Sequence, residues 1–210
     1  MEMSINKIDD ESSQIVAVFD FDGTITNRHT FWRYMRFVSG SRKFYLGILV
    51  LIPQIVLVLM GVIPIMQART KFIKKFLGGI TVPEEQACAV KFVNNKVNKY
   101  LRASAMRRLR WHQLKGHQTI LISNSPENYL VLWGNSVNFT HISGTRLEVK
   151  NGKLTGKVQG KDCVSGEKVE RLKQIIGEKK ENFFIFVYGD SSGDKELLEY
   201  ANVAFYRNWY

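Results

Sequence analysis

The chain has 210 residues, of which 45% are hydrophobic, so it can bury one α/β core with an insertion, or two small domains, without disulfides. Thirty lysines and arginines against nineteen aspartates and glutamates give a net charge of +11, which favours anionic partners: nucleic acid, anionic lipid or phosphorylated metabolites. Cys88 and Cys163 lack metal-ligand spacing, which argues against a cysteine metal site and predicts free thiols in a reducing compartment.

Residues 1–13 are polar and acidic and lack the basic and apolar regions of a secretory signal, so we expect a cytoplasmic protein. The run that follows, residues 14–19, predicts a buried parallel strand. Asp20 and Asp22 then lie at the carboxyl end of this strand, where open α/β sheets form their ligand crevices. An Asp-x-Asp pair is often only a turn or a cap, but the apolar neighbours here leave no solvated face. The pair is therefore the first candidate site.

Residues 27–38 predict an amphipathic helix with a basic edge, whose aromatic side chains either pack in a core or contact a phosphate or a membrane surface. Residues 44–67 contain no charged residue over 24 positions, which reaches the ~20 residues that a spanning helix needs. A single span would put Asp20 on one side of the bilayer and every later candidate catalytic residue on the other. We expect Pro53 and Pro64 to break the run into a hairpin of two helices of about ten residues each, too short to cross.

This predicted hairpin has two possible environments. It is either buried inside a helical cap domain or inserted into one leaflet from the cytoplasmic side, with the flanking lysines and arginines at the headgroups. Pro83 then opens a helical pattern that runs to about Gly116 and carries a basic cluster at residues 102–110. Such a cluster is either a solvated face or an attraction for lipid or phosphate.

The second half of the chain supplies three more polar groups at the ends of predicted elements. A strand at 117–123 leads into Ser123-Asn124-Ser125-Pro126, which is a capped turn or a phosphate cradle. A strand at 139–143 and a hairpin at 145–159 follow, then a helix at 166–176 with Lys168 near its start. A strand at 183–188 ends before Asp190 and Asp194, a helix covers 195–200, and a strand at 203–206 closes the sheet.

The order of these groups resembles that of the haloacid dehalogenase superfamily of phosphohydrolases, in its phosphoserine-phosphatase-like subfamily IB. Residues 20–24 look like the first motif of that family, Ser123 the second, Lys168 the third, and Asp190 with Asp194 the fourth. The resemblance implies a doubly wound, Rossmann-like parallel sheet with an inserted helical cap. The expected core is 1–26 and 103–210, and the expected cap is 27–102, with the apolar hairpin at 44–67.

The resemblance also implies roles for the residues. Asp20 would be a nucleophile that becomes an aspartyl-phosphate, and Asp22 a general acid and base. Mg²⁺ would bind Asp20, the backbone carbonyl of Asp22 and Asp190, with Asp194 acting through water or fixing the shell. The remaining residues would bind phosphate: Ser123, Asn124 and Lys168 with their side chains, Gly23 and Thr24 with backbone N–H groups. One departure is Gly193, since related proteins usually have Asn directly before the final Asp.

With an uncharged hairpin in its cap insertion, the chain resembles the subgroup that contains bacterial phosphatidylglycerophosphatase C. This resemblance predicts a phosphatase of a phosphorylated lipid or lipid-precursor headgroup, peripheral or re-entrant at the inner face of the cytoplasmic membrane. The alternatives are a soluble phosphatase of a small metabolite, a phosphotransferase, and a catalytically silent module that binds lipid or nucleic acid. The complete set of acids argues against the silent module and a nucleic-acid partner, and nothing indicates an obligate protein partner.

Overall fold

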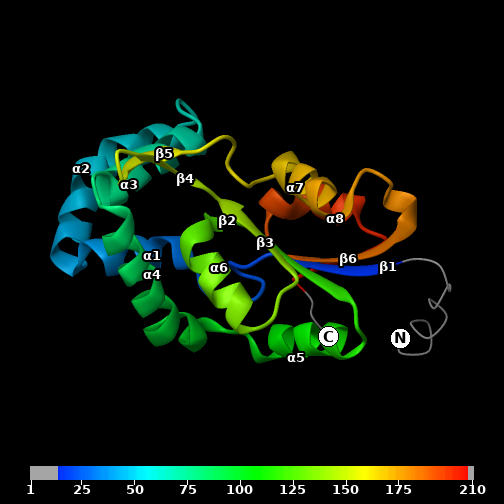
Figure 1. Ribbon diagram of the computed structural model, residues 1–210. Coiled ribbons are helices and arrows are strands. Elements are labelled where there is room, and N and C mark those ends of the chain that lie inside the picture. The colour runs from blue at the N-terminus through cyan, green and yellow to red at the C-terminus, as the bar shows by residue number, and fades with distance from the viewer. Residues whose placement is uncertain (1–13, 208–210) are drawn as a thin grey trace.

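The computed structural model describes residues 14–207, so the expectation for residues 1–13 lies outside the described part. A five-stranded parallel sheet forms the centre, in the order β3-β2-β1-β6-β7 (Figure 1). The strands are β1 (Gln14–Phe19), β2 (Gln118–Pro126), β3 (His141–Thr145), β6 (Phe183–Gly189) and β7 (Val203–Tyr206). A separate antiparallel hairpin joins β4 (Leu147–Lys150) to β5 (Lys153–Val158).

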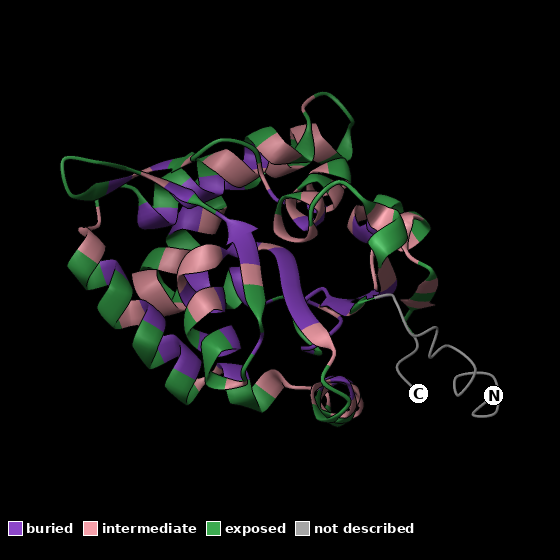
Figure 2. Ribbon diagram, turned by 45° about the vertical axis from the view of Figure 1, so that its right-hand side comes forward, coloured by how far each residue is buried: buried purple, intermediate pink, exposed green. Residues whose placement is uncertain are grey.

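Alternate residues of the strands face two hydrophobic clusters, one on each side of the sheet. Ala17 and Phe19 of β1 pack with α5 (Ala103–Leu114) and α6 (Glu127–Ser136). Val16 and Val18 pack with α7 (Gly166–Ile176) and α8 (Lys195–Tyr200). Figure 1 shows these two helix pairs on opposite sides of the sheet, and Figure 2 shows the buried residues concentrated on the strands. The predicted doubly wound parallel sheet is confirmed.

The inserted segment leaves the sheet after β1 and returns beside its own starting point. The N–H of Asn27 donates to the carbonyl of Tyr100 at 2.8 Å, and that of Arg102 to Ile25 at 2.8 Å. Between them lie α1 (Thr30–Ser39), α2 (Ser41–Leu59), α3 (Ile65–Leu77), α4 (Val82–Asn95) and a 3₁₀ turn (Val97–Tyr100). The helix expected from Pro83 to about Gly116 is thus two helices, α4 and α5, separated by that turn.

The cap also contacts a part of the chain that the sequence division places in the core. The N–H of Gly79 donates to the carbonyl of Leu154 in β5 at 2.8 Å, and the N–H of Leu154 donates to Ile80 at 2.9 Å. Figure 1 shows the β4-β5 hairpin alongside α3. The division at residues 27 and 103 therefore stays a prediction, with this hairpin as a bridge between the two parts.

Pro53 does not end a helix, so the expected hairpin of two ten-residue helices is wrong. Helix α2 continues through Pro53 for 19 residues, and the turn comes later, at Met60 to Pro64. Proline removes the hydrogen bond to the carbonyl four residues earlier, that of Leu49. Because Leu49 and Pro53 both lie on the exposed side of α2, this carbonyl is left on the solvent side of the helix rather than in the core.

The exposed side of α2 is apolar. Tyr45, Leu49, Ile52, Val56 and Leu59 recur at intervals of four and three residues, which places them on one face. They are between 43% and 81% exposed, and we call them the outer α2 face. Helix α2 is long and apolar enough to cross a membrane by length and composition, a test that core helices of soluble proteins also pass. Unlike a core helix, α2 is mostly exposed.

Candidate active site

The carboxyl ends of three neighbouring strands bring the predicted residues together. In the register of the sheet, Phe19 of β1 lies opposite Leu121 of β2 and Tyr188 of β6. The N–H of Asp20 extends the ladder by donating to the carbonyl of Tyr188 at 2.9 Å. Asp20 and Asp190 directly follow their strands, and Ser123 lies in β2 two residues beyond Leu121, so all three lie at the same edge of the sheet.

Lys168 lies at the centre of this edge, on the first turn of α7. Its Nζ donates to Oδ1 of Asp20 at 2.7 Å and to Oδ1 of Asp194 at 2.5 Å. All three side chains are buried. Burial acts to lower the pKa of Lys168, but the two carboxylates outweigh it and hold that pKa above its ordinary value. Lys168 therefore stays charged and neutralises part of a strongly acidic cluster.

Asp194 uses its second oxygen to shape the loop after β6. Its Oδ2 accepts hydrogen bonds from the N–H of Asp190 at 3.2 Å, from the N–H of Ser191 at 3.0 Å, and from the Ser191 hydroxyl at 2.8 Å. Burial acts to raise the pKa of Asp194, but Lys168 and Ser191 outweigh it and hold that pKa below its ordinary value. Both carboxylate oxygens are thus engaged by the protein, and the expected role of Asp194 toward a metal, through water or by fixing its coordination shell, stays a prediction.

Three acids are close enough to hold a cation. Oxygens of Asp20, Asp190 and Asp194 all lie within 4.8 Å of one another. Oδ1 of Asp190 is buried and has no hydrogen-bond partner among the described residues. Burial raises the pKa of Asp20 to about 7, and it raises that of Asp190 as well. A cation would satisfy this oxygen and counter both shifts, and a set of carboxylate oxygens suits Mg²⁺.

Gly23 is required for this arrangement. A Cβ on Gly23 would lie 2.1 Å from Oδ2 of Asp190, and the backbone has a φ of +86°. Only glycine provides both the space and this left-handed conformation without cost. The predicted Gly23 therefore lies beside the fourth motif.

The carboxylate of Asp22 lies outside the cluster of three acids and points toward the cap. Its Oδ1 accepts from the N–H and the hydroxyl of Thr30, at 2.8 and 2.6 Å, and its Oδ2 accepts from the hydroxyl of Ser125 at 2.8 Å. The expected contribution of Asp22 to a metal site is thus limited to its backbone carbonyl. The sequence interpretation missed Thr30, which lies 8 residues from Asp22, and Ser125, which lies 103 residues from it, because neither belongs to a pattern that predicts a contact with Asp22.

The predicted phosphate-binding residues are placed less directly. Ser123 is buried within β2, and its hydroxyl accepts from the N–H of Ser125 at 3.3 Å. Thr24 is also buried, and its Oγ1 has no hydrogen-bond partner among the described residues. Within residues 14–207, no hydrogen bond joins the side chain of Asn124 to the acids, so its role stays a prediction.

Asn124 instead connects the core with the cap through its carbonyl. This oxygen accepts from Thr145 at 2.8 Å and from Nη2 of Arg69, which reaches over from α3. Nε of Arg69 lies 2.9 Å from Oδ2 of Asp162, and its guanidinium lies over the ring of Phe31. Arg69 is a third residue that sequence reasoning missed, since it appeared only as one of several cations after the apolar run.

Comparison with known proteins decides the family, because the profile of haloacid dehalogenase-like hydrolases matches residues 17–199. The chain belongs to this family. The protein CicA of Caulobacter vibrioides is 29% identical over 198 residues, which cover 92% of this chain and 86% of CicA. A protein of unknown function from Bordetella pertussis Tohama I has a TM-score of 0.81 at 20% identity, over 92% of this chain and 90% of its own.

Among solved haloacid dehalogenase-like folds, a phospho-aspartyl intermediate analogue of phosphoserine phosphatase has a TM-score of 0.62 at 18% identity. The match covers 92% of this chain and 86% of that one. In this chain the position where the subfamily usually has Asn is Gly193, whose carbonyl accepts from the N–H of Ser165 at 3.0 Å. The fourth-motif loop is therefore tied to the start of α7, the helix that carries Lys168.

Proposed function

We propose that the protein is a Mg²⁺-dependent phosphomonoesterase that works through an aspartyl-phosphate and acts on a phosphorylated lipid or lipid-precursor headgroup. The observation that carries the catalytic part is Lys168, buried between Asp20 and Asp194 and beside Asp190. A buried lysine held by two carboxylates, with a third acid left unsatisfied, is a costly arrangement for stability alone. It is suited to neutralising the charge of a phosphoryl group.

In the proposed mechanism, an oxygen of Asp20 attacks phosphorus and forms a new O–P bond. The bond from phosphorus to the leaving oxygen breaks, its electron pair stays on that oxygen, and protonated Asp22 supplies the proton that makes the alcohol. Asp22, now a carboxylate, accepts a proton from water as the water attacks phosphorus and releases Asp20 and inorganic phosphate. Lys168, Ser123 and the N–H groups of Gly23 and Thr24 hold the phosphoryl oxygens. Bound Mg²⁺ supplies charge neutralisation to those oxygens.

Replacing Asp20 by Asn tests the catalytic part. Asp20→Asn removes the nucleophile but keeps the shape, so we expect hydrolysis of 4-nitrophenyl phosphate to fall by ~10³-fold or more. Exposed Glu199→Gln on α8 is the matched control and should keep full activity. Circular dichroism and thermal unfolding should show that both variants are folded. An Asp20→Asn protein with activity near that of wild type rules out the aspartyl-phosphate.

The lipid part of the proposal rests on the outer α2 face and the charges around it. Arg42 and Lys43 precede this face on α2, and Lys71, Lys74 and Lys75 of α3 are exposed as well. An exposed apolar helix face with cations at its edge is typical of helices that lie in the interface of an anionic membrane. In Figure 1, α2 lies at the edge of the molecule, away from the sheet. A cap that docks on such a membrane through α2 would lie next to the headgroup of a lipid substrate.

Sedimentation with vesicles tests this part. Wild type should sediment with vesicles that contain phosphatidylglycerol and less with phosphatidylcholine alone, and salt should weaken the binding. Leu49→Glu together with Val56→Glu places two charges on the outer α2 face and should abolish sedimentation. Leu114→Glu is the control, because Leu114 is 88% exposed but lies on α5. Unchanged sedimentation of the double variant rules out the outer α2 face as the membrane-binding surface, and a wild type that does not sediment removes the membrane from the proposal.

A soluble phosphatase of a small metabolite is the second candidate. It is favoured by the similarity of the fold to phosphoserine phosphatase. A screen of phosphoserine, sugar phosphates and phosphatidylglycerophosphate, with and without Mg²⁺, separates the two. Turnover of the soluble phosphates alone, in a protein that does not bind vesicles, selects the second candidate.

A further inference from the structure

The Asp22 carboxylate is held by residues from both parts of the molecule. Thr30 is the first residue of α1, which follows the exit of the chain from the sheet, whereas Ser125 belongs to β2. Thr30 gives two donors to Oδ1, its N–H at 2.8 Å and its hydroxyl at 2.6 Å, and Ser125 gives one to Oδ2 at 2.8 Å. All three residues are buried, so water does not compete for these bonds.

Asp22 also completes the start of α1. The first N–H groups of a helix have no partner inside it, and a side-chain oxygen usually accepts from one of them. His29 precedes α1 and makes no such bond with its side chain. The carboxylate of Asp22 takes this place for the N–H of Thr30, and its charge is favourable at the positive end of the helix. The position of α1 and the orientation of Asp22 are thus fixed together.

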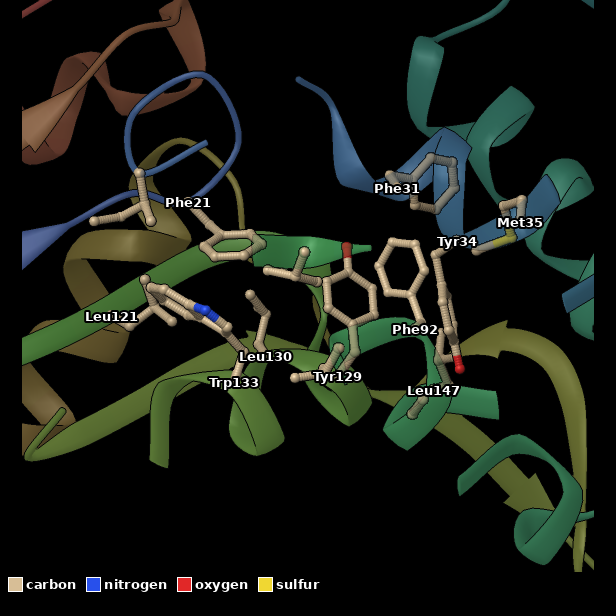
Figure 3. Close-up of a cluster of buried hydrophobic side chains, with 14 of the residues drawn as sticks. Phe21, Phe31, Tyr34, Met35, Phe92, Leu121, Tyr129, Leu130, Trp133 and Leu147 are labelled. Atoms are coloured by element: carbon tan, nitrogen blue, oxygen red, sulfur yellow. The ribbon is translucent and has the colours of Figure 1, made fainter. Parts of the chain in front are cut away.

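The number of protons fixes the direction of the hydrogen bonds. The hydroxyl of Thr30 has one proton to donate. Its oxygen lies 2.6 Å from Oδ1 of Asp22 and 2.8 Å from the hydroxyl oxygen of Tyr129. Thr30 donates this proton to Oδ1 of Asp22, so its oxygen accepts from the hydroxyl of Tyr129. Burial and the charge of Asp22 raise the pKa of Tyr129 well above its ordinary value, so Tyr129 keeps the proton that it donates. Figure 3 shows Tyr129 among the buried rings of Tyr34 and Phe92, which fix its position.

We infer that Thr30 and Ser125 are positioning residues for the general acid Asp22, and that Tyr129 orients the hydroxyl of Thr30. The inference rests on the proposed acid role of Asp22. Because Thr30 holds Oδ1 with two donors, Oδ2 is the oxygen that carries the proton to the leaving group, after the Ser125 hydroxyl has turned away. A cap whose α1 is displaced loses both bonds from Thr30. Proton transfer therefore requires α1 in the position seen here.

Leaving groups of different basicity test this inference. Thr30→Val keeps the volume and the N–H but removes the hydroxyl. We expect kcat to fall ~10-fold to 100-fold on phenyl phosphate, whose leaving group needs a proton, and by less than ~3-fold on 2,4-dinitrophenyl phosphate. Thr30→Ser should restore the rate on phenyl phosphate. Ser125→Ala and Tyr129→Phe should show the same discrimination, with a smaller effect for Tyr129, which does not touch Asp22.

Two controls separate the inference from its alternatives. Tyr34→Phe makes the same change in a neighbouring buried ring and should affect both substrates equally or not at all. Asp22→Asn should show the largest discrimination of the series. An equal loss on both substrates in Thr30→Val, or no rescue by Thr30→Ser, overturns the positioning role while wild type remains a phosphatase. If wild type hydrolyses neither ester with Mg²⁺ present, the proposed function falls, and the inference with it.

Discussion

The strand ends of the sheet and the outer α2 face invert the usual distribution of polarity in opposite ways. At the strand ends, Asp20, Lys168 and Asp194 are buried, although charged side chains are rarely buried unless paired. On α2, the five apolar side chains of the outer face are exposed over 15 residues, from Tyr45 to Leu59, and Leu46 and Val50 are exposed beside them. The first region meets the cost of burial by pairing within itself. In the second, Tyr45 contacts Phe44 and the guanidinium of Arg36, whereas the four aliphatic side chains stay exposed.

The two regions differ in the kind of ligand that they suit. Lys168 balances part of the buried negative charge, and the polar atoms without a hydrogen-bond partner there, among the described residues, are Asp190 Oδ1 and Thr24 Oγ1. This suits a small ligand of fixed geometry. The outer α2 face instead leaves a wide apolar surface unsatisfied, with no fixed geometry, which suits an extended apolar phase. Substitutions at the strand ends should therefore affect catalysis, whereas substitutions on the outer α2 face should affect contact outside the chain.

Removing the charge of Lys168 should have the largest effect. Lys168→Met leaves Asp20 and Asp194 buried without their cation, so we expect activity to fall by ~10³-fold and stability to fall by about 3 kcal/mol. Urea denaturation and turnover of 4-nitrophenyl phosphate measure the two losses. Lys195→Met is the control: its amine pairs with Glu199 at 3.8 Å on the surface, and both side chains are more than 60% exposed, so its loss should change little. Equal losses in the two variants would contradict the role of Lys168.

Removing the metal should have the next largest effect. At a Mg²⁺ concentration ~100 times its dissociation constant, binding stabilises the folded state by about 2.7 kcal/mol, which raises Tm by roughly 5 °C or more in a chain of this size. Asp190→Asn should lose this shift, because it removes a ligand charge next to Asp20. Thermal unfolding with Mg²⁺ and with EDTA measures it, and Glu199→Gln should retain the full shift. A shift that survives in Asp190→Asn places the cation elsewhere.

The sequence predicts the strand ends well because local patterns determine them. Short apolar runs bounded by turn residues predict β1, β2 and β6, and the order of parallel strands brings the acids that follow to one edge. Lys168 is predicted by the resemblance alone, since one lysine on a helix has no local signature. Its contacts with Asp20, 148 residues away, depend on the packing of α7 on the sheet.

The cap is less predictable, for a physical reason in each case. Pro53 lowers the helical propensity of α2 locally. Because the carbonyl that loses its hydrogen bond lies on the solvent side, the loss costs little free energy and the helix continues. Thr30 and Ser125 contact Asp22 only because α1 and β2 pack together beside it, and no spacing in the sequence predicts this packing. Arg69 binds the carbonyl of Asn124, which any residue at that position would offer.

The smallest effect is expected on the outer α2 face, and it decides whether that face is structural. Leu49→Gln with Val56→Gln makes exposed positions polar, so the free energy of unfolding should change by no more than about 0.5 kcal/mol. Leu51→Ala on the same helix, where Leu51 is 6% exposed, should cost about 2 to 4 kcal/mol, because it leaves a cavity against the rest of the cap. Urea denaturation of the two variants makes the comparison. A double variant as unstable as Leu51→Ala would mean that the face packs against the protein itself. A stable one leaves contact outside the chain as the reason for five exposed apolar side chains.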